Sequence, residues 1–129
     1  MAKKASLWLG IIFVVIGILG YVSNPIVGSE GLFVTNAAHD WVHIIFGIIL
    51  IVASLGAAAK ASVTMVVLGA VYLLVAVLGF FMQSPLFGLI EVNAADNWLH
   101  VVLGLLLVLL GKKAGTPAEM PSAAPQQQM

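Results

Sequence analysis

Four long apolar runs divide this chain, and short segments rich in polar residues, glycine or proline separate them. The pattern predicts helices over 7–22, 36–59, 62–82 and 93–111. The runs are continuously apolar rather than alternating, which favours helices over strands. Their lengths suit a hydrocarbon core about 30 Å thick, and lipid excludes an open sheet edge. We therefore expect an all-α fold, a transmembrane four-helix bundle.

The two ends of the chain differ in character. Lys3 and Lys4 precede the first apolar run as they would in a signal peptide, but no small-x-small cleavage site follows. We expect an uncleaved first span and a four-span membrane domain over 1–113. The segment 114–129 contains three prolines and a glutamine triplet, which predicts a disordered cytoplasmic tail.

Composition supports a location in the bilayer. The chain has 129 residues, of which 62% are hydrophobic and 8% are charged. A soluble domain carries roughly 25% charged residues, so we expect lipid to be the main partner of this surface. The net charge of zero argues against nucleic-acid binding. The absence of cysteine excludes disulfides and cysteine-ligated metal centres.

The charged residues predict an orientation. In a four-span arrangement all basic residues fall on one side, namely Lys3, Lys4, Lys60, Lys112 and Lys113. Four acidic residues fall on the other side, namely Glu30, Asp40, Glu91 and Asp96. The positive-inside rule then places both termini in the cytoplasm, and we expect a prokaryotic plasma membrane. Trp41 and Trp98 would mark the outer interface and Trp8 the inner one.

The chain also reads as a tandem duplication. The segment N-A-A-H-D-W-V-H-I-I-F-G at 36–47 recurs at 93–104 as N-A-A-D-N-W-L-H-V-V-L-G. The first and third spans match as well, which defines repeat one as 6–60 and repeat two as 61–113. Each repeat is a helical hairpin of the same topology, so we expect a pseudo-twofold axis along the membrane normal. Small residues that suit helix packing recur in both repeats, namely Gly10, Gly17, Gly47, Gly69 and Gly104.

The repeated segment holds most of the polar chemistry. Its two asparagines are predicted helix caps. Residues four apart share a helix face, so His39 and His43 form one stripe and Asp96 and His100 another. If the repeats pair, these stripes meet inside the bundle near its outer end. The expected polar cluster is Asn36, His39, Asp40, His43, Asn93, Asp96, Asn97 and His100, with Asp40 and Asn97 as partners of the inner set.

Three interpretations of the cluster remain open. The first is a hydrogen-bonded clamp between helices in a non-enzymatic protein without a cofactor. The second is a metal site formed by His39, His43, Asp96 and His100, which suits Zn, Cu, Fe or Ni. The third is haem held between His43 and His100, with the nearby glycines making room for the porphyrin.

Other polar residues suggest less. Tyr72 lies in mid-span, and we expect it to bond a neighbouring carbonyl group. No serine has a nearby base, and no catalytic residue is predicted. A small transporter or channel subunit is a further alternative, but it requires a homo-oligomer or another membrane partner, because four helices leave little room for a pore.

The motifs resemble a bacterial family of small four-span membrane proteins that is described only as a domain of unknown function. Its signature is N-x-x-H-[ND]-x-x-H-x-x-x-G followed later by D-N-x-x-H. The first part falls on Asn36, His39, Asp40, His43 and Gly47, and the second on Asp96, Asn97 and His100. Asp40 stands where asparagine is common. The resemblance covers about residues 6 to 112 and implies a four-span inner-membrane protein, without an activity or a substrate.

Overall fold

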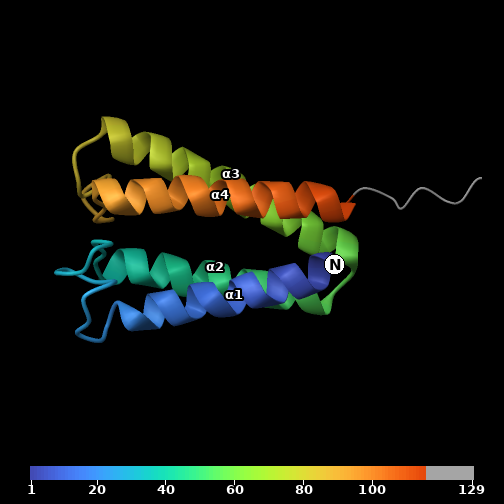
Figure 1. The fold of residues 1–129 in the computed structure, drawn as a ribbon. Coiled ribbons are helices and arrows are strands. Elements are labelled where there is room, and N and C mark those ends of the chain that lie inside the picture. Colours follow the sequence, from blue (N-terminus) through green and yellow to red (C-terminus); the bar gives the residue numbers. More distant parts are fainter. Residues whose placement is uncertain (116–129) are drawn as a thin grey trace, which may run out of the picture.

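Four helices account for most of the residues that the structure describes. The computed structural model describes residues 1–115. Its elements are α1 (Ala2–Leu19), α2 (Ala37–Leu55), α3 (Ala58–Phe81) and α4 (Ala94–Gly115), shown in Figure 1. Each helix is long and apolar enough to cross a membrane. The predicted all-α transmembrane four-helix bundle is therefore confirmed.

Three helices extend further than the apolar runs at the lysine-rich end, whereas α2 ends at Leu55, before the predicted residue 59. α1 begins at Ala2 and α3 at Ala58, and α4 continues through Lys112 to Gly115. Hydropathy marks the part of a helix that lies in lipid, whereas backbone hydrogen bonds continue through lysine and alanine, which are good helix formers. α4 thus includes residues 114 and 115 of the expected tail, and the rest of that segment, 116–129, lies outside the described residues.

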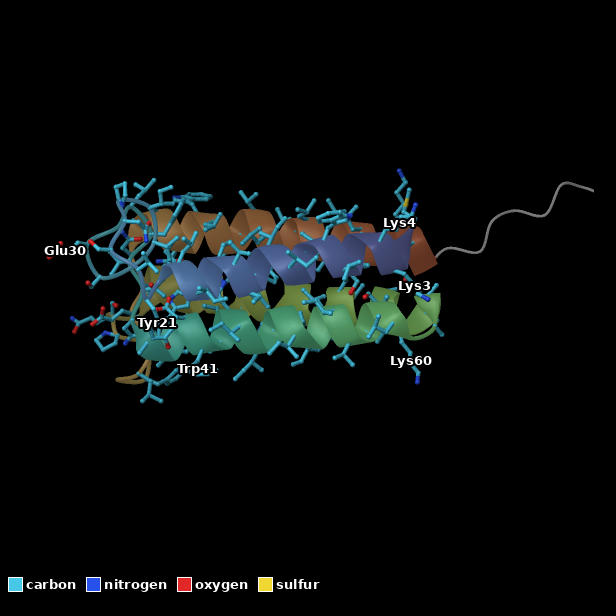
Figure 2. The ribbon with its side chains drawn as sticks, turned by 90° about the horizontal axis from the view of Figure 1, so that it is seen from below. Lys3, Lys4, Tyr21, Glu30, Trp41 and Lys60 are labelled. Atoms are coloured by element: carbon cyan, nitrogen blue, oxygen red, sulfur yellow. The ribbon has the colours of Figure 1, made fainter. Side chains whose placement is uncertain are left out.

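The helices form two antiparallel hairpins, α1 with α2 and α3 with α4 (Figure 1). The connections 20–36 and 82–93 lie at one end of the bundle, and the N-terminus and the short α2–α3 turn lie at the other. Figure 2 places Lys3, Lys4 and Lys60 at the turn end and Glu30 and Trp41 at the opposite end. The charge separation expected from the sequence is thus present in space.

Glycines bring the helices of each hairpin into backbone contact. A Cβ atom added at Gly10 would lie 2.7 Å from the Gly47 carbonyl oxygen, and one at Gly47 would lie 2.6 Å from the Gly10 oxygen. Gly69 and Gly104 face each other in the same way, at 2.8 and 3.0 Å. A side chain at Gly17 would meet the Asp40 carbonyl oxygen at 2.6 Å. Such close approach supplies the van der Waals contact that holds helices together in lipid.

Large side chains fill the bundle axis between the hairpins. The largest fully buried ones include Phe13, Leu50, Met65, Tyr72 and Leu107. Outside this core, apolar residues such as Val52, Val63 and Leu109 are more than 60% exposed, which suits a surface in contact with lipid. The interior is therefore packed with side chains drawn from all four helices.

Candidate functional site: a buried histidine cluster

Two asparagines begin the helices that carry the cluster. The Oδ1 atoms of Asn36 and Asn93 accept the backbone N–H three residues further on, at 3.1 and 2.9 Å, as predicted for helix caps. Their Nδ2 groups reach across the molecule. Asn36 donates to the Leu89 carbonyl at 2.8 Å, and Asn93 donates to the Leu32 carbonyl at 2.9 Å. Each asparagine therefore caps its own helix and bonds the loop of the other hairpin.

Three histidine rings meet between α2 and α4. The rings of His39 and His100 stack with centroids 5.4 Å apart, and His43 lies edge-on to His100 at 6.1 Å. All three residues are at most 4% exposed. The helical spacing thus places the two predicted stripes in contact, at the end of the bundle that carries the long connections.

Tyr72 and Phe13 complete the cluster, so every helix contributes a ring. Tyr72 stacks on His100 with centroids 4.9 Å apart, and its hydroxyl oxygen lies 3.3 Å from His43 Nδ1. Phe13 stacks on Tyr72 at 5.1 Å and lies edge-on to His43 at 5.8 Å. The expectation that Tyr72 bonds a carbonyl group is therefore wrong. A tyrosine in the middle of an apolar span already marks Tyr72 in the sequence. Nothing distinguishes Phe13 from the many apolar residues around it.

Hydrogen-bond partners determine where the ring protons lie. His39 Nδ1 lies 2.7 Å from the Glu91 carbonyl oxygen, which can only accept, so neutral His39 carries its proton on Nδ1. Its Nε2 lone pair then accepts from His43 Nε2 at 3.2 Å. His43 Nδ1 in turn accepts from the Tyr72 hydroxyl. The result is a directed chain of donors from Tyr72 through both histidines to the Glu91 carbonyl.

Asp96 leaves one buried oxygen without a donor. His100 Nδ1 donates to the Asp96 backbone oxygen at 2.8 Å, although the carboxylate Oδ2 is only 3.2 Å from the same nitrogen. Oδ2 also lies 4.0 Å from His39 Nε2, but it has no hydrogen-bond partner among the described residues. Asp96 is 1% exposed, and a buried carboxylate without a donor is costly. The Asp96 side chain therefore leaves an unsatisfied buried acceptor within the cluster.

Asp40 and Asn97 lie against glycines of their own hairpins. A Cβ atom added at Gly20 would collide with the Asp40 carboxyl group, and one at Gly79 would collide with the Asn97 amide. Each residue lies one position further along its helix than the histidine stripe, so its side chain points toward the other helix of the same hairpin. The two glycines make room for these buried side chains.

The geometry does not favour haem. The space beside Gly47 is occupied by the backbone of Gly10, and the space beside Gly104 by Gly69 and Leu73. The glycines therefore admit a neighbouring helix rather than a porphyrin. A smaller group fits better, because one ring nitrogen from each of His39, His43 and His100 lies within 4.8 Å of the other two.

Comparison with known proteins confirms one part of the resemblance, the match to a domain of unknown function. No curated protein and no solved structure matches the chain. Residues 3–112 match the family described as a domain of unknown function, DUF4383. The matched region includes the whole polar cluster and nearly all of the four helices. This apolar four-helix chain is therefore an integral membrane protein that belongs to the DUF4383 family.

Proposed function

We propose that the chain is a non-enzymatic, multi-pass component of a prokaryotic plasma membrane, in which the polar cluster clamps two helical hairpins together at the outward-facing end. One observation carries this proposal. The bonds from Asn36, Asn93 and His39 all cross from one hairpin to the other, and they end on the carbonyl groups of Leu89, Leu32 and Glu91.

The two hairpins need specific contacts to hold them together in lipid, and the clamp provides them. Backbone contacts at glycines hold each hairpin together, but they lie within the hairpins rather than between them. Lipid provides no hydrophobic drive for the hairpins to associate, so packing and interhelical hydrogen bonds must supply it. At the lysine-rich end, the buried Ser6 hydroxyl donates to the Leu50 carbonyl within the first hairpin. The bonds between hairpins named above lie toward the opposite end.

The burial of the cluster supports a non-enzymatic role. A catalytic base must come within hydrogen-bond reach of its substrate. His39, His43 and His100 are at most 4% exposed, and rings from all four helices surround them. The filled bundle axis similarly favours a clamp over a channel formed by one chain.

The proposed orientation rests on the charge separation. Lys3, Lys4 and Lys60 lie at one end (Figure 2), and Lys112 and Lys113 occupy the last turn of α4, which ends there as well (Figure 1). By the positive-inside rule this end faces the cytoplasm, together with the N-terminus and the end of α4. The histidine cluster then lies toward the outer surface.

Matched contacts support the proposed duplication. Gly10 faces Gly47 as Gly69 faces Gly104, and the capping asparagines make reciprocal bonds. We infer that repeat one (6–60) and repeat two (61–113) are copies with the same topology. They differ within the cluster, because His39 corresponds to Asp96.

A cleavable turn tests the clamp in the full chain. A protease site is inserted between the exposed residues Gly56 and Ala57, and the hairpins are separated or retained on a column after cleavage in detergent. The parent hairpins should stay together, whereas hairpins with Asn36→Ser, Asn93→Ser and His39→Phe combined should separate. Asn24→Ser is the matched control, because its bonds stay within the first loop and the last residue of α1. Retention of the triple variant, or separation of the parent, would contradict the proposal.

A further inference from the structure

We propose that His39, His43 and His100 bind one divalent first-row transition metal ion of the zinc class, with Asp96 as the fourth ligand. One ring nitrogen from each histidine lies within 4.8 Å of the others. The Nε2 atoms of His39 and His43 are 3.2 Å apart. This matches the edge of roughly 3.3 Å in a tetrahedron with Zn–N bonds of 2.0–2.1 Å. The site goes beyond the clamp, which needs no ion.

In two of the rings, the nitrogen that faces away from the proposed ion already donates a hydrogen bond, as in known metal sites. Metal-ligating histidines nearly always donate the other ring N–H to a carbonyl or carboxylate group, which fixes the tautomer and the ring orientation. His39 Nδ1 donates to the Glu91 carbonyl at 2.7 Å, and His100 Nδ1 donates to the Asp96 carbonyl at 2.8 Å. Both rings therefore keep an Nε2 lone pair for an ion.

His43 requires one proton shift to join the site. Its Nε2–H donates to His39 Nε2 when no ion lies between them. On metal binding this proton moves to His43 Nδ1, 3.3 Å from the Tyr72 hydroxyl oxygen. A phenolic hydroxyl both donates and accepts, so Tyr72 turns from donor to acceptor. The proton stays on His43, and all three imidazoles ligate in the neutral form.

The buried carboxyl group of Asp96 gives an electrostatic reason to expect a divalent ion at this site. Its Oδ2 atom is buried without a donor, 4.0 Å from His39 Nε2 and 3.2 Å from His100 Nδ1, so it must move toward the ligating Nε2 atoms to become a ligand. The lysines lie at the opposite end of the bundle (Figure 2) and offer the carboxylate no nearby compensation. A divalent ion among the rings removes this deficit. It also explains the use of one aspartate where the other repeat has His39, since a symmetric clamp needs no such difference.

The donor set indicates the kind of ion and its role. Three imidazoles and one carboxylate, with no cysteine in the chain, suit Zn²⁺, Ni²⁺ or Cu²⁺ rather than soft-ligand ions such as Cu⁺. Four protein ligands would close the coordination sphere, as in structural zinc sites. The ion would therefore join α2 to α4 across the bundle.

Metal binding is measured on the full chain, purified with an affinity tag that contains no histidine and stripped with a chelator. Zn²⁺ is added and counted by elemental analysis after desalting, and Co²⁺ reports the geometry through its visible d–d bands. We expect one ion per chain and the intense bands of tetrahedral Co²⁺. Binding far below one ion per chain, or the weak spectrum of octahedral Co²⁺, would overturn the proposal.

Variants locate the ion. His43→Asn and His100→Asn should abolish tetrahedral binding, and Asp96→Asn should weaken it. Tyr72→Phe keeps the ring stacking but removes the partner of His43 Nδ1, so we expect about a 10- to 100-fold loss of affinity, as for other groups that orient a metal ligand. If a histidine variant fails to fold, Tyr72→Phe and Asp96→Asn decide the question.

Asp40→Asn is the matched control, because it removes an equally buried carboxylate that lies against Gly20. Its Zn²⁺ affinity should remain that of the parent. An equal loss in Asp40→Asn and Asp96→Asn, or parent-like affinity in Tyr72→Phe, would contradict the assignment. Helical circular dichroism verifies the fold of each variant. The outcome is independent of the clamp, which is tested by hairpin retention in stripped protein.

Discussion

His39 and His43 lie one turn apart on α2, and a single N–H group joins their Nε2 atoms across 3.2 Å. The pair links the buried Tyr72 hydroxyl to the Glu91 carbonyl near the surface. As a clamp, it connects α2 to both helices of the second hairpin and their loop. As a metal site, it is the place where an ion would replace the shared proton. The following measurements probe this arrangement and the bundle around it.

The tautomers of the two histidines are a direct prediction. In stripped protein at neutral pH, ¹⁵N spectra of the imidazoles should show His39 protonated on Nδ1 and His43 protonated on Nε2. Tyr72→Phe should leave His39 unchanged and lower the stability by about 1 kcal/mol, the scale of interhelical hydrogen bonds in membranes. Observation of His39 protonated on Nε2 would contradict the assigned chain.

Each capping asparagine should stabilise the protein in two ways that can be measured separately, through its helix cap and through its bond to the other hairpin. Asn36→Ser keeps an oxygen for the helix cap but loses the bond to the Leu89 carbonyl, which should lower the free energy of unfolding by about 1 kcal/mol. Asn36→Ala loses the cap as well and should lower it by about a further 1 kcal/mol. Unfolding in mixed micelles measures both. Equal stability of the two variants would show that the cap contributes nothing.

Replacement of a closely packed glycine by alanine should destabilise the protein, contrary to the usual preference of helices for alanine. Alanine is normally better than glycine in a helix by about 1 kcal/mol. Gly47→Ala should nevertheless destabilise the protein, because its Cβ atom would lie 2.6 Å from the Gly10 carbonyl oxygen. Gly56→Ala is the control, since its Cβ atom would meet nothing closer than 3.6 Å. Thermal unfolding of both variants decides the matter, and a stabilised Gly47→Ala would contradict the packing described.

The orientation can be read with introduced cysteines, because the chain has none of its own. Ser29→Cys should react with an impermeant thiol reagent added to intact cells, whereas Lys60→Cys should react only after the membrane is opened. Both positions are exposed and lie in segments at opposite ends of the bundle. The reverse pattern of labelling would place the histidine cluster on the cytoplasmic side.

Helical spacing made much of the site predictable. Residues four apart share a face, so the convergence of His39, His43 and His100 followed from their positions in two matched segments. The contacts of Tyr72 and Asp40 did not follow. Each depends on how far one helix is rotated and displaced relative to its neighbour, and local sequence does not encode this rotation. The acceptor role of the Glu91 carbonyl likewise required the path of a loop.

The sequence by itself determined that four apolar helices form, where they begin and end to within a few residues, and that the lysines share one side. Lipid enforces these features locally, because an unpaired backbone group or a lone charge in hydrocarbon is expensive. Only the tertiary structure decided that Gly10 meets Gly47, that Asp40 lies against Gly20 and that Tyr72 joins the histidines. Those contacts arise from close packing between segments distant in the chain. Many rotations of an apolar helix suit the lipid equally well, but few of them fit the neighbouring side chains.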